Sequence, residues 1–417
     1  MRARNRLGGV ALMGPRDGER VRVVPVAGDK QLEQFISLPW QIYREDPLWV
    51  PPLRREMKGM LTGTGNALFR SGPHALFLAL QGDTPVGRIC AGINLALNRS
   101  KGQNDGYFCL FETVQDCDVA RTLFDRAVAY VASLGANAIR GPVSPTNGDE
   151  YRGLLVEGTT HRPMLFQSYN PGYYSAFLER YGFAKEIDYL AFRYSAEDFS
   201  DKSRIIDYAM KRYGFRTDPV DLRHLDRELQ EIKQVIAESM PEEWPDLIPP
   251  GTDELREMAG QLRGMAVPEL IRIARCGTRP IGFSVALPDY NQLLVKMNGR
   301  LFPTGWLTFL LRKREIDAIR MFIVFVVPDF HGKGVLHALY HSTVREAVRL
   351  GYRWGEGSTV HETNRAMIRE NLSAGGLHYK TYRIYRRPIP QMPIEMEAEG
   401  GDAPFPGGLR PATPGSG

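Results

Sequence analysis

From position 326 to position 336 the chain reads Val326-Val327-Pro328-Asp329-Phe330-His331-Gly332-Lys333-Gly334-Val335-Leu336. The β-branched run at 323–327 predicts a strand, and the apolar spacing that follows predicts an amphipathic helix. The two glycines predict a short loop between this strand and this helix. The N–H groups of such a loop and the positive end of the helix dipole face one small volume, which favours a phosphate group. The stretch therefore predicts an anion-binding site, with an ordinary tight turn between strand and helix as the alternative.

The predicted elements after this stretch continue the same unit. A second strand is predicted at 353–360, then a short helix opened by Asn364, a glycine pair at 375–376 and a closing strand at 379–386. This order resembles the acyl-CoA-binding core of the GNAT (Gcn5-related N-acetyltransferase) superfamily.

The GNAT signature is Arg/Gln-x-x-Gly-x-Gly/Ala between a strand and a helix, and the chain matches it in part. His331 stands in place of the Arg or Gln, Gly334 fits, and Leu336 replaces the last small residue. The resemblance implies an acyl-CoA thioester as the donor. The donor-binding residues that it implies are Val326, Val327, His331, Gly332, Lys333, Gly334, Val335 and Asn364.

Composition bounds the class of protein. The chain has 417 residues, of which 43% are hydrophobic and 24% charged, and this predicts a globular protein with room for two domains. The net charge of +5 is spread along the chain, which argues against nucleic acid as a partner and suits an anionic cofactor or lipid surface.

Cysteine usage and hydropathy indicate a compartment. The four cysteines form no Cys-x-x-Cys pair, which favours free thiols in a reducing cytoplasm and predicts no metal site. No apolar run reaches the roughly 18 residues of a membrane span, and the start lacks a secretory signal. We therefore expect a cytoplasmic protein whose contact with the inner membrane, where there is any, is peripheral.

Two halves of the chain repeat. Three pairs of landmarks keep nearly the same separation: Gly87 and Gly282, Asn170 and Asn364, and Gly182 and Gly376. This predicts a tandem duplication of an α/β (α+β) unit, each a mixed, mostly antiparallel sheet flanked by helices. The predicted segments are a disordered start at 1–20, a first GNAT-like domain at 21–200, a second at 201–390, and a disordered tail at 391–417.

The two halves differ at the predicted donor site. In the first half the acidic turn at 115–118 leads straight into the helix at 119–134, with no glycine loop. Its carboxylates would repel a pyrophosphate. We therefore expect the second half to bind the donor and the first half to shape the acceptor site.

Transfer of an acyl group to an amine needs alignment, removal of a proton and a donor for the developing oxyanion. The GNAT resemblance implies a gap between the strand before the loop and the next strand, with a backbone N–H near Val326 or Val327 contacting the thioester. On that next strand, alternation places Ser358 and Glu362 on one face and His361 on the other.

Glu362 is the first candidate for the general base, and a Glu that only caps the helix at Asn364 is the alternative. His361, with an ordinary pKa of about 6.5, is a second candidate base, and Ser358 completes the catalytic candidates. The tyrosine that many GNAT enzymes use to protonate the leaving thiolate is replaced by Asn371. The acid therefore stays open between Tyr379, Tyr382 and water.

Two insertions predict acceptor contacts. The polar segment at 140–153 should fall over the central cleft, where Asn147, Asp149 and Glu150 would read an amine and hydroxyls; a surface turn is the alternative. The segment at 289–314 carries apolar residues, among them Trp306, next to three basic residues at 312–314. This suits a membrane interface or an acyl-chain channel, with a helix packed between domains as the alternative.

The chain from about 21 to 390 resembles a family of bacterial tandem-GNAT proteins that includes the bacterial ceramide synthases. The resemblance is carried by 38–40, Asp46-Pro47-Leu48-Trp49-Val50-Pro51-Pro52, Tyr169-Asn170-Pro171-Gly172-Tyr173-Tyr174, 301–303 and 379–383. We assign Tyr174 and Trp306 to the substrate. The resemblance implies transfer of a long acyl chain from acyl-CoA to a primary amine, such as that of a sphingoid base.

Three alternatives stay open at the level of sequence. The donor could be carried by acyl carrier protein in place of CoA. The enzyme could instead be an N-acetyltransferase of a small amine. Because His331, Leu336 and Asn371 depart from the working GNAT pattern, a degenerate module that binds lipid or a protein partner is the third.

Overall fold

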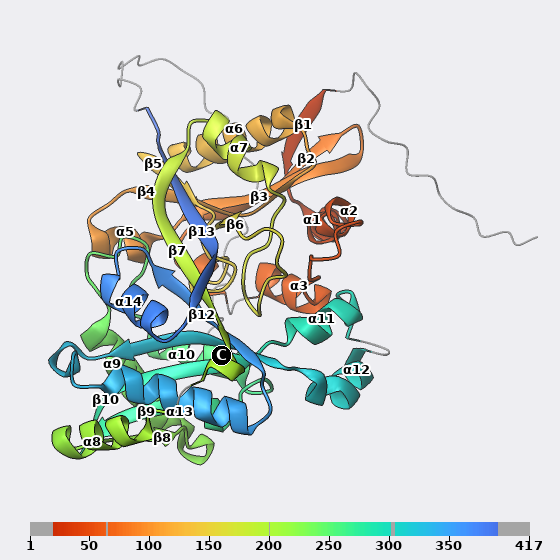
Figure 1. Ribbon diagram of the computed structural model, residues 1–417. Coiled ribbons are helices and arrows are strands. Elements are labelled where there is room, and N and C mark those ends of the chain that lie inside the picture. Colours follow the sequence, from red (N-terminus) through yellow and green to blue (C-terminus); the bar gives the residue numbers. More distant parts are fainter. Residues whose placement is uncertain (1–19, 64–65, 200, 302–304, 391–417) are drawn as a thin grey trace, which may run out of the picture.

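The computed structural model describes residues 20–63, 66–199, 201–301 and 305–390. The predicted disordered segments at 1–20 and 391–417 lie outside these residues, Arg20 excepted. In the described residues, helices flank one large mixed sheet (Figure 1), which confirms the predicted α/β class. No described helix has the length and apolar character needed to cross a membrane.

The first half begins with a strand and ends with a long strand at the centre of the molecule. Its elements are β1 (Val21–Pro25), α1 (Gly28–Ser37), α2 (Pro39–Ile42), α3 (Arg54–Thr62), α4 (Ala67–Arg70), β2 (His74–Gln81), β3 (Thr84–Ile93), α5 (Leu95–Lys101), β4 (Asp105–Thr113), α6 (Cys117–Ser133), β5 (Ala138–Gly141), β6 (Leu154–Glu157), α7 (Tyr173–Arg180) and β7 (Ala184–Ser195).

In the described residues the second half repeats the order of strands, but a helix precedes its first strand and it has no counterpart of β6. Its elements are η1 (Ala196–Asp198), α8 (Ser203–Tyr213), β8 (Phe215–Pro219), η2 (Leu222–His224), α9 (Leu225–Ser239), α10 (Thr252–Leu262), η3 (Pro268–Leu270), β9 (Ile271–Cys276), β10 (Arg279–Pro288), α11 (Asn291–Met297), α12 (Gly305–Arg312), η4 (Lys313–Glu315), β11 (Ala318–Val326), η5 (Pro328–Phe330), α13 (Val335–Arg349), β12 (Trp354–His361), α14 (Arg365–Ser373) and β13 (Leu377–Pro388).

The halves exchange their last strands. The strand order is β1-β2-β3-β4-β5-β13-β7-β12-β11-β10-β9-β8, with β6 pairing β13. β13 thus lies beside β5 of the first half, and β7 lies beside β12 of the second. The two exchanged strands pair antiparallel, with Tyr382 opposite Tyr189 and Ile384 opposite Ile187, and they cross the middle of the molecule (Figure 1). The division of the chain at residue 200 stays a prediction.

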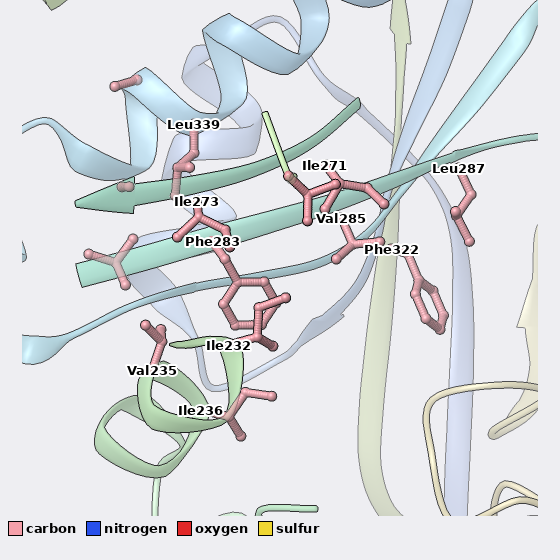
Figure 2. Close-up of a cluster of buried hydrophobic side chains, with 14 of the residues drawn as sticks. Ile232, Val235, Ile236, Ile271, Ile273, Phe283, Val285, Leu287, Phe322 and Leu339 are labelled. Atoms are coloured by element: carbon pink, nitrogen blue, oxygen red, sulfur yellow. The ribbon is translucent and has the colours of Figure 1, made fainter. Parts of the chain in front are cut away.

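Each half has its own hydrophobic core. Figure 2 shows the core of the second half, with Leu339 of α13 on one side of strands β9 and β10 and Ile232, Val235 and Ile236 of α9 on the other. Burying a side chain of this size contributes about 1.5–3 kcal/mol. In the first half, α6 takes the place of α13 against β3.

Gly87 and Gly282 occupy equivalent positions in the two halves, each facing a helix packed on the sheet. A Cβ on Gly87 would lie 2.7 Å from Leu123 of α6, and a Cβ on Gly282 would lie 3.2 Å from Leu339 of α13. Both glycines therefore let a helix approach the sheet closely. This shared packing explains why the landmark recurs in the sequence.

Candidate active site

Strands β11 and β12 separate in the second half. They pair in parallel only from Ala318 opposite Trp354 to Met321 opposite Gly357, and beyond this register they diverge. The N–H of Val327 donates to the carbonyl of Ile281 on β10 (3.0 Å). Since successive N–H groups of a strand point to opposite edges, the N–H and C=O of Val326 face the gap. A backbone donor therefore lies where the GNAT resemblance places one.

The loop after β11 presents backbone N–H groups at the start of α13. Gly332 and Gly334 have φ of +73° and +83°, which glycine adopts without strain, and no side chain caps α13. Nε2 of His331 lies 2.9 Å from the carbonyl of Val326, so this ring ties the loop to the strand. Lys333 adds a positive charge to the loop. These features fit a pyrophosphate.

The corresponding helix of the first half is closed to an anion. Oδ1 of Asp116 accepts from the N–H of Asp118 (2.8 Å) and of Val119 (3.3 Å). The carboxylate therefore occupies the positive end of α6 that a phosphate would need. Binding of the donor by the second half alone stays a prediction.

Two of the predicted donor residues have a role in the fold. Val335 is buried at the first turn of α13. Oδ1 of Asn364 accepts from the N–H of Met367 (3.0 Å), so this side chain caps α14. Asn170, its counterpart in the repeat, instead binds the backbone of Leu155.

Polar side chains of the first half cover the divergence of β11 and β12 on the face opposite α13. Arg320 of β11 donates to Oγ of Ser358 (2.8 Å), to the carbonyl of Leu165 (2.7 Å) and to Asp149 (3.2 Å). Thr359 of β12 donates to Asp149 as well (2.9 Å). The structure thus brings Asp149 and Ser358 together at the point where the strands separate.

A fully buried ion pair lies beneath this cluster. Nζ of Lys380 is 3.6 Å from Oε2 of Glu356, and both side chains have no exposed surface. Ser358, Gln167 and Tyr379 also donate to Glu356. With the carboxylate oxygens satisfied in this way, the pair holds the exchanged strand β13 and β12 in a fixed relation.

His361 lies at the end of β12, with 5% of its surface exposed. Its ring stacks on Trp244, with ring centres 5.2 Å apart and planes within 6°. Nδ1 accepts from the N–H of Thr363 (3.2 Å), so the neutral ring carries its proton on Nε2. Burial lowers the pKa of His361 below its usual 6.5. A neutral imidazole with a donating Nε2–H is the result.

The carboxylate of Glu362 is engaged elsewhere. Oε1 accepts from the N–H of Asp188 (3.0 Å), and Oε2 lies 2.6 Å from Nζ of Lys185. Both partners belong to β7. Glu362 therefore ties the end of β12 to the exchanged strand, and it does not cap α14, since Asn364 does.

The remaining acceptor candidates occupy different places. Asn147 accepts from Nδ2 of Asn94 (2.8 Å) and lines a small cavity, and Glu150 accepts from Thr146 (2.7 Å) with its pKa raised by burial. The assignment of Tyr174 to the substrate is corrected: its ring is fully buried and its hydroxyl bonds to Glu112 and Thr113 in the core of the first half. Trp306 lies on the exposed side of α12.

Sequence reasoning missed two features of this site. The segment between α9 and α10 places Trp244 against His361 and Asp246 against Arg152 (3.3 Å). Tyr194 of β7 donates to Oδ1 of Asn371 (2.5 Å), the position where the GNAT resemblance expects a tyrosine. The prolines around Trp244 signal an ordered loop, but nothing local signals the exchange of β7 that delivers Tyr194.

No described group of three or more His, Cys, Asp or Glu side chains is arranged to hold a metal ion.

Comparison with curated proteins gives relatives along nearly the whole chain. The chain is 30% identical over 377 residues to the bacterial ceramide synthase of Caulobacter vibrioides, covering 88% of this chain and 97% of the relative. It is 28% identical over 371 residues to protein YghO of Escherichia coli, covering 86% and 93%. No protein-family model matches the chain.

Solved structures share the fold at low identity. A GCN5-related glucosamine N-acetyltransferase region of a fungal multidomain β-N-acetylglucosaminidase has a TM-score of 0.57 at 13% identity, covering 89% of this chain and 38% of that one. A tandem GNAT protein from the clavulanic acid biosynthesis pathway has 0.55 at 12%, covering 89% and 100%. A GCN5-related N-acetyltransferase from Sphaerobacter thermophilus has 0.50 at 11%, covering 88% and 95%.

These likenesses establish the fold, and the relative at 30% identity establishes the family. The gap beside Val326 and the uncapped, glycine-bounded start of α13 lie where the GNAT resemblance predicts the donor. The chain therefore belongs to the family of the Caulobacter vibrioides bacterial ceramide synthase and has the tandem GNAT fold.

Proposed function

We propose that this protein transfers a long acyl chain from acyl-CoA to the primary amine of a sphingoid base. The observation that carries the proposal is the likeness to a relative named bacterial ceramide synthase, which extends over 97% of that relative. The amine nitrogen bonds to the thioester carbonyl carbon, the carbon–sulfur bond breaks, and the amine proton ends on the thiol of CoA.

The donor would lie along the loop and the gap. The N–H groups of Gly332, Gly334 and Val335 and the charge of Lys333 hold the pyrophosphate, and the N–H of Val326 polarises the thioester carbonyl. Tyr194, whose pKa is raised by burial, gives its proton to the leaving thiolate beside Asn371 and takes back the proton that the amine loses. This supplies the acid that Asn371 itself cannot provide.

The surface of α12 supports a lipid acceptor. Trp306, Leu307, Leu310 and Leu311 are 44%, 44%, 64% and 71% exposed, and η4 adds basic residues directly after them. Phe309 stacks on Tyr290 (5.5 Å) and anchors the helix. α12 lies at the outer edge of the molecule (Figure 1). We place this face on the cytoplasmic surface of the inner membrane, because both acyl chains and sphingoid bases partition there.

The proposal is tested by turnover of the purified full-length protein. Thiol release is measured with palmitoyl-CoA or acetyl-CoA, with and without sphinganine, and the amide is identified by mass spectrometry. Sphinganine-dependent release with palmitoyl-CoA is expected. Release with acetyl-CoA and a small amine alone would establish an N-acetyltransferase instead, and release only from a palmitoylated acyl carrier protein would replace the donor. CoA binding without turnover would establish a binding module.

A matched pair of variants tests the donor site. Lys333→Glu places a carboxylate beside the pyrophosphate and should raise KM for acyl-CoA about tenfold at low salt, with a smaller effect at high salt. Lys30→Glu makes the same charge change on exposed α1 and should leave KM unchanged. Equal KM values for the two variants would remove the loop from the donor site.

A further inference from the structure

The segment between α9 and α10 leaves the second half and docks on the first. Nη1 of Arg140 donates to the carbonyl of Pro245 (2.7 Å). Oδ2 of Asp246 accepts from the hydroxyl of Tyr189 (2.6 Å) and from Nη1 of Arg152 (3.3 Å). The segment is therefore fixed by buried, charge-assisted contacts, and Asp246 is its point of attachment to β7 and to the 140–153 insertion.

Trp244, two residues earlier, lies across the gap between the separated strands. Its ring stacks on His361 of β12 and lies 6.4 Å from the ring of Phe325 on β11. Phe325 directly precedes Val326, whose N–H faces the gap. Trp244 thus forms a wall of the site on the side from which an acceptor approaches, away from α13.

Two buried polar atoms beside this wall have no hydrogen-bond partner among the described residues. They are Oδ1 of Asp246, whose side chain is 4% exposed, and Nε2 of His361. Burial acts to raise the pKa of Asp246, but the positive charges of Arg152 and Arg140 outweigh it and hold that pKa below its usual value. One atom is therefore an anionic acceptor, and the other is a neutral N–H donor.

A buried carboxylate oxygen without a partner is costly, so such an atom in a native site indicates a missing ligand group or water. Asp246 and Arg152 line a cavity of about 30 Å³ together with Asn94, Asn98, Ser144 and Asn147. Neither His361 nor any residue of β11 or β12 lines this cavity, so it does not hold the acceptor, whose amine must meet the thioester in the gap between those strands.

We propose that Asp246 binds the amino group of the acceptor and that Nε2–H of His361 donates to a hydroxyl on a neighbouring carbon. The site then selects primary amines that carry an adjacent hydroxyl, the pattern of a sphingoid head group. Donation of an N–H to Oδ1 orients the nitrogen, whose lone pair is free for the thioester once the ammonium form has lost a proton to solvent. The inference deepens the proposed function and rests on it for the identity of the acceptor.

Binding measurements separate this inference from turnover. Three probes are titrated into the full-length protein by calorimetry, with and without CoA: a short-chain sphinganine, the matching diol without the amine, and the matching alkylamine without hydroxyls. The wild-type protein should bind the sphinganine about 10- to 100-fold more tightly than either partial probe, as expected for hydrogen bonds to buried, charged or polar groups.

Each variant should remove one preference. Asp246→Asn should bind the sphinganine and the diol equally, while His361→Phe, which keeps the ring stacked on Trp244, should bind the sphinganine and the alkylamine equally. Asp188→Asn is the control. Like Asp246→Asn it removes a carboxylate that pairs with an arginine, but Asp188 lies on β7, so this variant should keep both preferences. Should Asp246→Asn fail to fold, His361→Phe still tests the site.

The outcomes distinguish the two proposals. Preferences that persist in both variants, or a wild-type protein without preference, overturn the acceptor site, and sphinganine turnover would still uphold the proposed function. Preferences lost as expected in a protein that does not acylate sphinganine would uphold an amino-alcohol site and overturn the sphingoid substrate.

Discussion

The carboxyl group of Asp289 is buried in surroundings that favour its neutral form. It lies at the end of β10, and its Oδ1 accepts from the N–H of Leu165 (2.9 Å). Burial raises its pKa from an ordinary 3.8 to about 7. The folded protein therefore holds this proton more tightly than the unfolded chain does. The stabilising contribution is full below about pH 4 and is lost as the pH rises through about 7.

Asp289→Asn removes this titration and keeps an oxygen for the N–H of Leu165. The difference in the free energy of unfolding, variant minus wild type, should increase by about 2–3 kcal/mol between pH 5 and pH 8, because only the wild type loses this stabilising contribution. Urea unfolding at a series of pH values measures the gap. Asp29→Asn on exposed α1 is the control, and parallel curves for Asp289→Asn and wild type would show that Asp289 titrates normally.

Glu362 should matter for stability and little for catalysis. Glu362→Gln keeps an acceptor for the N–H of Asp188 and loses the charge opposite Lys185, a pair whose side chains are both partly exposed. We expect a loss of at most about 1 kcal/mol in unfolding free energy, because exposed pairs contribute little. Steady-state kinetics should give unchanged kcat; a tenfold lower kcat with intact stability would return Glu362 to the role of general base.

Some residues of the site could be predicted from neighbouring sequence, and others could not because their partners are distant in the chain. Ser358 and His361 could be predicted because they lie on the strand that comes after the predicted loop and helix. Asp246 and Tyr194 could not, since their partners Tyr189 and Asn371 are distant in sequence and the contacts depend on strand exchange. Glu362 as general base stays a prediction, and the sequence gives no sign that Lys185 of β7 contacts its carboxylate.

At the scale of elements, the strand–loop–helix unit was predictable because its chemistry is local. The two homologous helices α6 and α13 differ at one turn: Asp116 caps the first, and Gly334 with no side-chain cap precedes the second. Both features can be read from neighbouring residues. By contrast, the membrane or interdomain role of 289–314 could not be decided, because burial of a short apolar helix depends on what covers it.

The face of α12 predicts binding to anionic vesicles. Leu310→Ser with Leu311→Ser should reduce partition onto phosphatidylcholine–phosphatidylglycerol vesicles at least tenfold, by removing exposed apolar area. Lys313→Glu with Arg314→Glu should reduce the preference for these vesicles over pure phosphatidylcholine by about 30-fold or more. Co-sedimentation at low and high salt measures both.

The control for α12 is a second exposed apolar pair on another helix. Ile205 and Tyr208 of α8 are 70% and 63% exposed, so Ile205→Ser with Tyr208→Ser makes a similar change elsewhere. This variant should bind vesicles as the wild type does. Equal loss in both double variants would mean nonspecific adsorption. A concentration-dependent dimer that only the α12 variant loses would make the face an interface between copies.

For the whole molecule, the exchange of β7 and β13 is the feature that sequence could not reveal. Both strands are aromatic-rich and follow a helix that ends at a glycine, so either satisfies the pattern of either half. Which sheet each one joins is decided by long-range pairing and by partners such as the buried Lys380–Glu356 pair, which joins β13 to β12. The repeat was therefore predictable, and the way its copies interlock was not.

The interlocking predicts that neither half folds alone. A chain of residues 20–199 would contain β7 but lack β13, leaving an edge of β5 unpaired and the arginine-paired Asp105 without Arg386. A chain of 201–390 would contain β13 but lack β7, leaving β12 without its antiparallel partner. Exposed sheet edges with buried polar groups aggregate or stay unfolded.

Expressed together, the two chains should co-purify as one complex with native circular dichroism and a single cooperative transition. An isolated 201–390 chain that is monomeric, cooperative and binds acyl-CoA would instead show that the second half is an independent domain and that β7 is only a covering strand.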